Sequence, residues 1–172
     1  VQDVFPDAAW QRCQAHFARN IAEGAPKRLR AGLKSELVEM FNAPTLAEAR
    51  RRKDGIIADY AQAAPKAAEC LDAGFDDAMT VMELPEAMRR CTRTSNYLER
   101  LNKEVKRRSN VIGIFPNAAS AARLMGAVLM EEDERWAAAR KIYYSTACRE
   151  LEKKAGVLAK IARMQKELRK AA

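Results

Sequence analysis

Apolar residues recur at helical spacing along most of the chain, and prolines, glycines and capping residues divide the pattern into segments. Between residues 26 and 41, leucine, methionine and phenylalanine recur every three or four positions, which predicts a helix that Pro26 opens. Thr45 is followed three residues later by Glu48, the spacing of a capping box, so a further helix is predicted from Thr45 to about Ala63. The dominant pattern is therefore α-helical.

Two stretches beside these helices are less regular. Residues 10–17 have the apolar flanks of a possible short strand, and they lead into a helix over 16–23 that Gly24 ends. Pro65 opens a short helix that Gly74 is predicted to end, and residues 75–84 are ambiguous between helix and strand. Few other segments are rich in β-forming residues.

The second half of the chain begins with a strongly charged helix over residues 96–108. Its apolar residues form one narrow stripe that is predicted to face a core: Leu98, Leu101 and Val105. A loop is expected over 109–116, after which Asn117 caps a helix that reaches Trp136. The remainder reads as continuing helix and is basic, with eight lysines or arginines against three glutamates from Arg149 onward.

Composition fits a folded, mainly helical protein and adds a charge bias. The chain has 172 residues, of which 48% are hydrophobic, and contains only 7 glycines and 6 prolines. Its formal net charge of +8 favours polyanions, so nucleic acid is the first partner class to consider. There is no run of about 18 apolar residues and no signal-peptide pattern, so we expect a soluble cytosolic protein with no membrane contact.

The densest cluster of functional side chains lies on the charged helix. Glu99, Asn102, Lys103 and Lys106 share one face, and a carboxylate beside amide and ammonium groups suits a divalent cation near phosphates. The alternative is that Glu99 and Lys103 form an ordinary surface ion pair at (i, i+4) spacing. Spacing alone leaves both interpretations open.

Basic side chains on this helix are candidate contacts for DNA phosphates, with a solvated charged face as the alternative: Arg100, Lys103, Lys106, Arg107 and Arg108. Trp10 and Trp136 are expected to pack in a core, whereas Tyr97 either stacks on a base or packs.

Cys13 and His16 have half of the spacing of a zinc site. His16 is the only histidine and the other three cysteines are distant in sequence, so a structural zinc site is not expected. From the residues alone, the pair reads as a buried thiol and a hydrogen-bonded core imidazole.

Several blocks occur in a diagnostic order. Phe5-Pro6, Trp10-Gln11-Arg12-Cys13 and His16-Phe17-Ala18-Arg19-Asn20 are followed by Thr94-x-Asn96-x-x-Glu99-Arg100, a basic run, and Phe115-Pro116-Asn117. Over roughly residues 1–140, with Glu131 and Trp136 included, the chain resembles the C-terminal half of the Mutator-type insertion-sequence transposases of bacteria. Ser95 stands where that family commonly has a second threonine.

The resemblance implies a mainly α fold that is the C-terminal part of a ribonuclease-H-like α/β core with an all-helical insertion. It divides the chain into the end of the core (1–20), the insertion (21–90), core helices with the glutamate motif (91–140) and a basic helical tail (141–172). The family holds two Mg²⁺ or Mn²⁺ ions with an Asp-Asp-Glu triad, and its glutamate corresponds to Glu99. Cys13, His16, Thr94 and Asn96 would be auxiliary motif residues.

The implied function is transposition of an insertion element by metal-dependent DNA cleavage and strand transfer. Double-stranded DNA, namely transposon ends and target, and a second subunit would be its partners, in the bacterial cytoplasm and near the nucleoid. Both family aspartates belong upstream of Phe5-Pro6, so this chain is not expected to cut DNA alone. The alternative function is a non-catalytic helical DNA-binding or interaction module.

Overall fold

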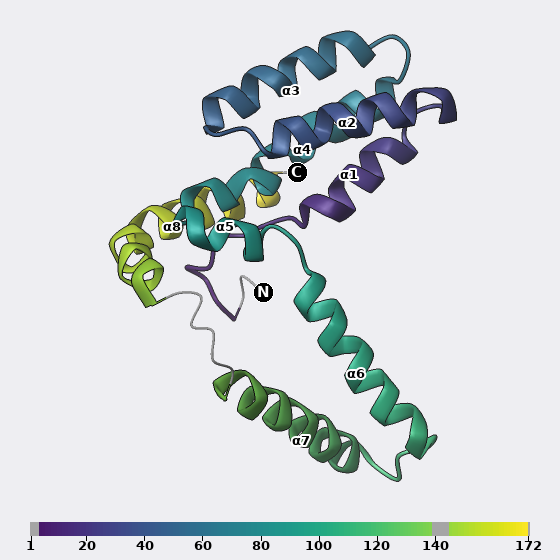
Figure 1. Cartoon of the computed structure of the whole chain (residues 1–172), viewed down its shortest axis with the longest axis vertical. Coiled ribbons are helices and arrows are strands. Elements are labelled where there is room, and N and C mark those ends of the chain that lie inside the picture. Colours follow the sequence, from purple (N-terminus) through teal and green to yellow (C-terminus); the bar gives the residue numbers. More distant parts are fainter. Residues whose placement is uncertain (1–3, 139–144, 172) are drawn as a thin grey trace. The chain divides into compact units, whose positions relative to one another are not determined.

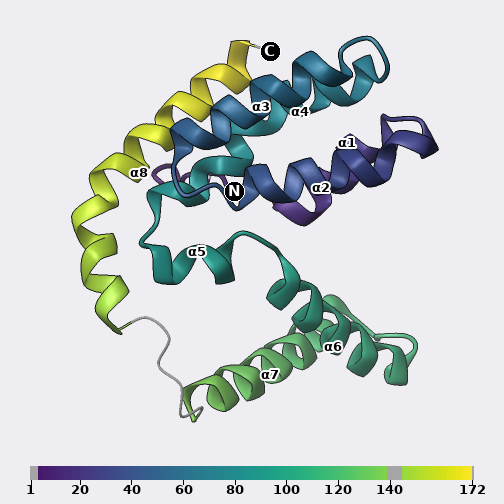
Figure 2. The same cartoon turned by 45° about the horizontal axis from the view of Figure 1, so that its top comes forward.

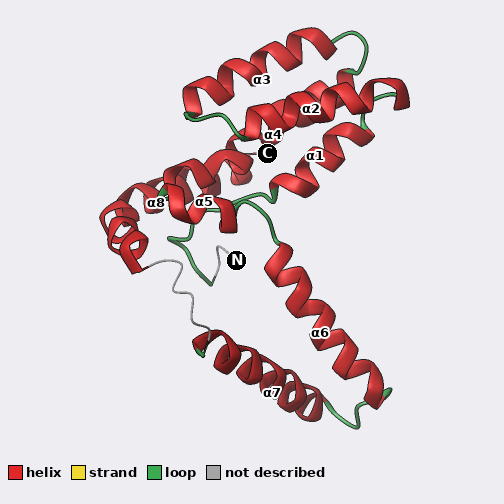
Figure 3. Ribbon diagram, viewed as in Figure 1, coloured by secondary structure: helices red, strands yellow, loops and turns green. Residues whose placement is uncertain are grey.

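The computed structural model describes residues 4–138 and 145–171. Within these ranges all regular secondary structure is helical (Figures 1 and 3). The α-helices are α1 (Gln14–Glu23), α2 (Arg30–Phe41), α3 (Leu46–Tyr60), α4 (Pro65–Met79), α5 (Glu86–Thr92), α6 (Asn96–Ile112), α7 (Ala118–Ala137) and α8 (Ser145–Ala171). Two 3₁₀ helices accompany them, η1 (Lys27–Leu29) and η2 (Thr80–Glu83). The mainly α prediction is therefore confirmed.

The chain divides into two compact units. The first contains residues 1–94 and 144–172, and therefore α1–α5 and α8; the second contains residues 95–143, and therefore α6 and α7. The segments 1–20 and 21–90 and the basic tail from residue 144 onward thus belong to one unit. The glutamate motif begins at the boundary between the two.

The core of the first unit is formed by α1, α2, α3 and α4 (Figure 2). Leu33, Leu37 and Met40 recur at helical spacing along α2 and have no exposed surface. Phe17 of α1 is also fully buried, and its ring centroid lies 6.2 Å from that of Phe41. Full burial of one such side chain contributes roughly 1.5–3 kcal/mol relative to exposure to water, so apolar burial holds the bundle together.

The sequence pattern predicts that Gly74 ends the helix opened by Pro65, but Gly74 lies inside α4. A Cβ atom at this position would come within 2.5 Å of Phe17 Cε2 and 2.7 Å of Phe17 Cζ. The glycine therefore allows close packing of α1 on α4 instead of terminating a helix. Residues 75–84, ambiguous in sequence, continue as the end of α4 and η2.

The possible strand over residues 10–17 is wrong: residues 8–13 are irregular and α1 begins at Gln14. The polar groups of this segment bond to the end of α4 instead of to a neighbouring strand. Arg12 N donates to Asp77 O (2.8 Å), and Gln11 Nε2 donates to Ala78 O (2.9 Å). The Gln11 side chain thus links this segment to α4, and a hydrophobicity pattern does not reveal such a contact.

The C-terminal part of α8 lies beside the end of α4, η2 and the first turns of α3 (Figure 2). Its Gln165, only 8% exposed, accepts a hydrogen bond from Trp10 N (2.7 Å) and donates to Trp10 O (3.0 Å) and Asp77 Oδ1 (2.8 Å). A buried amide that is fully hydrogen-bonded avoids a large desolvation cost. The basic tail is thus packed on the bundle through a specific polar contact.

The predicted helix caps are found with one difference. Thr45 Oγ1 accepts from Glu48 N (3.2 Å), but the Glu48 carboxylate accepts from Arg51 Nε (2.9 Å) and Arg52 Nε (2.9 Å) in place of completing a capping box. Hydrogen bonds from these guanidinium groups, Arg51 first, lower the pKa of Glu48 below its usual value. Asn117 Oδ1 accepts from Ser120 N (2.8 Å), as a capping residue should.

The remaining boundaries differ from those expected. Helix α6 continues through residues 109–112, so the predicted loop begins only at Gly113. Helix α5 was not expected at all. Beyond Trp136, α7 ends at Ala137 and residues 139–144 lie outside the described residues. The helix predicted for the rest of the chain is found as α8, from Ser145 to Ala171.

The second unit is a helical hairpin in which residues 113–117 connect α6 to α7 (Figure 1). Gly113 has φ 71°, a left-handed conformation that glycine adopts without strain, so it permits the reversal. Arg108 Nη2 donates to both carboxylate oxygens of Glu131 at 3.1 Å and so joins the two helices. Val128 is the buried residue of α7, but Leu98 on the predicted apolar stripe is 63% exposed.

Candidate nucleic-acid interface

Glu99 lies in the first turn of α6 and is exposed to solvent. Ser95 Oγ donates to Glu99 Oε1 at 2.6 Å, and Glu99 N donates to Ser95 O at 2.9 Å. The partial positive charge of a helix N-terminus favours a carboxylate at this position. The hydroxyl that replaces the family's second threonine therefore orients Glu99.

The auxiliary motif residues belong to both units. In the first, the half-buried Cys13 directly precedes α1, and its Sγ atom lies 3.3 Å from Nδ1 of the exposed His16. The expected core imidazole is therefore wrong. Thr94 is the half-buried last residue of the first unit before α6, and Asn96 is the exposed first residue of α6.

A metal centre needs several hard or imidazole ligands in one place. Within residues 4–138 and 145–171, no group of three or more His, Cys, Asp or Glu side chains is placed to hold a metal ion. Glu99 can offer one carboxylate. The residues described do not by themselves fit a two-metal centre, and no catalytic step is assigned to them.

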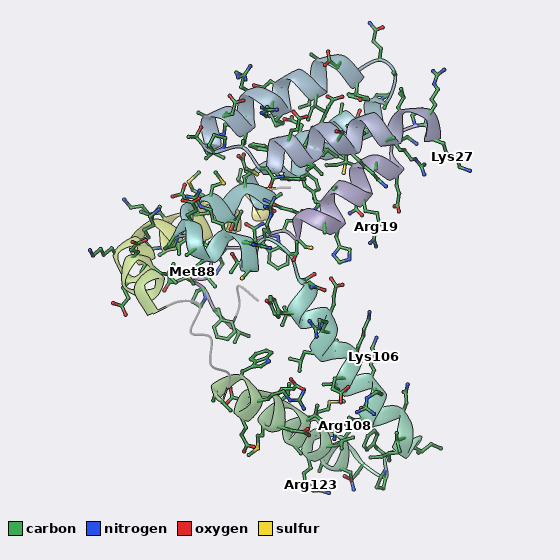
Figure 4. All side chains as sticks on the ribbon, in the orientation of Figure 1. Arg19, Lys27, Met88, Lys106, Arg108 and Arg123 are labelled. Atoms are coloured by element: carbon green, nitrogen blue, oxygen red, sulfur yellow. The ribbon has the colours of Figure 1, made fainter. Side chains whose placement is uncertain are left out.

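The basic residues of α6 fall into two groups. Arg107 and Arg108 both bond to Glu104: Arg107 Nη2 at 2.6 Å and Arg108 Nε at 3.0 Å from Oε1. Arg100, Lys103 and Lys106 form no ion pair with any residue in the described ranges. Figure 4 shows Arg108 between the two helices and Lys106 on the side of α6 away from α7.

This pairing also sets the charge of Glu104. Hydrogen bonds from Arg107 and Arg108 lower the pKa of Glu104 to about 2. Glu104 therefore stays ionised at any physiological pH, and it partly neutralises the two arginines. Arg100, Lys103 and Lys106 are the cations of α6 that remain available for a phosphate.

A cleft of about 510 Å³ lies between α6 and α7, and we call it the hairpin cleft. Its lining combines aromatic, basic and paired acidic side chains: Tyr97, Arg100, Leu101, Lys103, Glu104, Arg107, Glu132, Arg135 and Trp136. Trp136 is 55% exposed and Trp10 is 37% exposed, so the expectation that both tryptophans pack in a core is wrong. Sequence reasoning missed the cleft because its two walls are more than 20 residues apart in the chain.

Comparison with known proteins identifies the family. The sequence matches the Mutator family of transposases over residues 1–139. It is 38% identical over 138 residues to the transposase for insertion sequence element IS256 in transposon Tn4001 of Staphylococcus aureus, which covers 79% of this chain and 35% of that protein. No solved structure matches the chain significantly.

Two further relatives agree. The transposase for IS406 of Burkholderia multivorans is 37% identical over 134 residues, 77% of this chain and 34% of the relative. The transposase for IS1081 of Mycobacterium tuberculosis is 35% identical over 138 residues, 80% of this chain and 33% of the relative. The chain spans about a third of the length of these curated relatives.

All three relatives are transposases for insertion sequence elements. The chain belongs to the Mutator family, as the order of its sequence blocks indicates. Among the residues described, no helix is both long enough and apolar enough to cross a membrane.

Proposed function

We propose that this chain is the glutamate-bearing part of a DNA transposase that moves an insertion element by metal-dependent phosphodiester cleavage and strand transfer. The observation that carries the proposal is the position of Glu99. It lies in the motif Thr94-x-Asn96-x-x-Glu99-Arg100 at the exposed start of α6, beside the basic side chains of Arg100, Lys103 and Lys106. Membership of the Mutator family supports the same assignment.

In this proposal Glu99 supplies one carboxylate ligand to Mg²⁺ or Mn²⁺. Bound divalent ions supply stabilisation of the charge that develops on the oxygens of a DNA phosphate. The remaining ligands would come from a ribonuclease-H-like core to which this chain contributes only in part. The role of the described residues is to orient the Glu99 carboxylate and to hold DNA beside it.

The proposed partner is double-stranded DNA, both the transposon ends and the target, together with a second transposase subunit. Arg100, Lys103 and Lys106 are the proposed phosphate contacts, because none of them forms an ion pair with another residue that the structure describes. Contacts of this kind are independent of base sequence. The bacterial nucleoid is the proposed location.

The test is a substitution of Glu99 in a full-length transposase that carries this segment. Glu99→Gln keeps the size and hydrogen-bonding capacity of the side chain but removes the charge that a cation requires. We expect element excision to fall at least 100-fold while binding to the transposon ends stays within a factor of about 2, on the scale of a lost active-site electrostatic contact. Electrophoretic mobility shift and excision assays measure the two effects.

Glu104→Gln is the matched control, because Glu104 lies on the same helix but is bonded to Arg107 and Arg108. This control should retain most excision activity. Normal excision by the Glu99 variant would overturn the ligand assignment. It would favour the second candidate function, a non-catalytic DNA-binding module.

A further inference from the structure

The hairpin cleft combines two exposed aromatic rings with a surplus of positive charge. Tyr97 is 53% exposed and Trp136 is 55% exposed, and both line the cleft. Tyr97 lies at the start of α6 and Trp136 at the end of α7, so the rings come from opposite walls. Large aromatic side chains that keep about half of their surface in water are suited to stacking on a ligand.

The charges of the cleft point to an anion. Its lining has four cationic side chains and two carboxylates, an excess of two positive charges. The carboxylates are occupied within the protein, since Glu104 bonds to Arg107 (2.6 Å) and Glu132 to Arg135 (2.5 Å). The excess is therefore carried by Arg100 and Lys103, which form no ion pair within the described part of the chain.

We propose that the hairpin cleft binds an unpaired nucleotide of the DNA substrate, with its base stacked on Trp136 or Tyr97 and its phosphate held by Arg100 and Lys103. This inference rests on the proposed function and defines a subsite of it. In a duplex each base face is covered by its neighbours, so only an unpaired base presents a face to these rings. A volume of about 510 Å³ is within the range of small-ligand sites.

The cleft adjoins the proposed metal ligand. Lys103 lines the cleft and follows Glu99 by four residues on α6, so the two residues are neighbours on the helix surface, about 6 Å apart along its axis. A phosphate bound at Lys103 is therefore about one helical turn from Glu99. The unpaired nucleotide is one that flanks the phosphate to be cleaved.

The chain contains two tryptophans, so Trp10→Phe leaves Trp136 as the only indole. The hydrogen bonds of Trp10 to Gln165 use its backbone N–H and C=O and survive this change. In this background we would titrate the 172-residue chain with two DNAs whose overhangs carry equal charge, a duplex with a short 3′ overhang and the same duplex with abasic sites in the overhang. The blunt duplex is the reference.

The normal overhang is expected to quench Trp136 emission and to bind about 5–100-fold more tightly than the abasic overhang, the scale of 1–3 kcal/mol per stacked base. Trp136→Ala, and separately Tyr97→Ala, should reduce this preference, whereas Trp136→Phe should retain part of it. Far-ultraviolet circular dichroism confirms that each variant keeps its helices.

Equal affinity for normal and abasic overhangs, with unchanged Trp136 emission, would overturn the cleft assignment while duplex binding left the proposed function standing. Failure to bind any of the three DNAs at low salt would count against the proposed DNA interface itself. A change in Trp136 emission that depends on protein concentration without DNA would overturn the nucleotide site in favour of a contact between two copies.

Discussion

Arg93 Nε donates to Gln14 Oε1 at 2.9 Å, and Gln14 N donates to Arg93 O at 3.0 Å, across 79 residues of chain. Gln14 is 4% exposed at the start of α1, and the Arg93 guanidinium also bonds to Asn42 Oδ1 (3.0 Å) and Phe41 O (3.2 Å). Arg93 precedes Thr94, the first residue of the glutamate motif. It therefore anchors the chain to the bundle directly before α6.

Replacing Arg93 should destabilise the first unit. Arg93→Met keeps the aliphatic stem but removes every donor, which leaves the buried Gln14 oxygen without this partner. We expect the free energy of unfolding to fall by about 1–3 kcal/mol, measured by urea denaturation followed by circular dichroism. Arg90→Met is the matched control, since Arg90 is exposed and makes no side-chain hydrogen bond within the described ranges, and it should change stability by less than about 0.5 kcal/mol.

Gly74 should not tolerate a methyl group. The Cβ of Gly74→Ala would meet the ring of Phe17, which is fully buried. Overpacking of this kind costs about 1–3 kcal/mol. Alanine gains roughly 1 kcal/mol in helix propensity over glycine, which offsets only the lower end of that cost. Thermal and urea denaturation should therefore show a loss of stability.

Gly55→Ala tests the same substitution without the collision. Gly55 lies within α3. Apart from its chain neighbours and the nearby backbone of α3, no atom lies within 4 Å of the position that a Cβ would take. Helix propensity alone then predicts a gain of about 0.5–1 kcal/mol. If both alanine variants shifted stability in the same direction by similar amounts, the close approach of α1 to α4 at Gly74 would be disproved.

Tyr60 should make the bundle sensitive to alkali. Burial, followed by the hydrogen bond from Tyr60 Oη to Glu36 Oε1 (2.8 Å), raises the pKa of Tyr60 to about 12. Below pH 10 the phenol is neutral in both folded and unfolded chains, and its contribution is fully present. As pH rises from about 10 through about 12, the unfolded chain ionises first, so stability is lost.

Tyr60→Phe should be less stable at pH 8 by about 0.5–1.5 kcal/mol, the value of one hydrogen bond, and its stability should fall less steeply above pH 10. Denaturation series for both proteins at several pH values measure the difference. Parallel curves for the two proteins above pH 10 would show that Tyr60 ionises normally in the folded chain.

The two groups of cations on α6 should contribute differently to DNA binding. Removing Arg100, Lys103 and Lys106 together should lower the slope of log K against log salt by up to about 2.7, the value for three phosphate contacts. Removing Arg107 and Arg108 should change it less, because both bond to Glu104. Fluorescence anisotropy with a labelled duplex measures both slopes, and a larger effect from the second pair would contradict the division.

Local sequence signals predicted much of the helical structure. The spacing of Leu33, Leu37 and Met40 correctly placed them in the core, and Thr45 and Asn117 cap helices as expected. These predictions succeed because helix period and capping depend on residues within about one turn of each other. The placement of Glu99 at the exposed start of a charged helix follows from the same local pattern.

The sequence predictions that are wrong depend on contacts between distant parts of the chain. Gly74 is a residue type that commonly ends helices, but the Phe17 ring from α1 lies beside it within α4. Residues 10–17 have the pattern of a possible strand, but the polar groups of Gln11 and Arg12 bond to the end of α4. Trp136 has the pattern of a core residue, yet it lines the hairpin cleft opposite α6 and is half exposed. Each outcome depends on an element distant in the chain.

The amino-acid sequence alone therefore determined the helical class and the family, because these rest on short-range periodicity and on the order of local motifs. Tertiary structure alone decided which glycine is a packing site, which arginines are neutralised by carboxylates, and which aromatic rings face a common cleft. The physical reason is that burial and ion pairing are set by distances between side chains that folding brings together, and no local pattern encodes those distances.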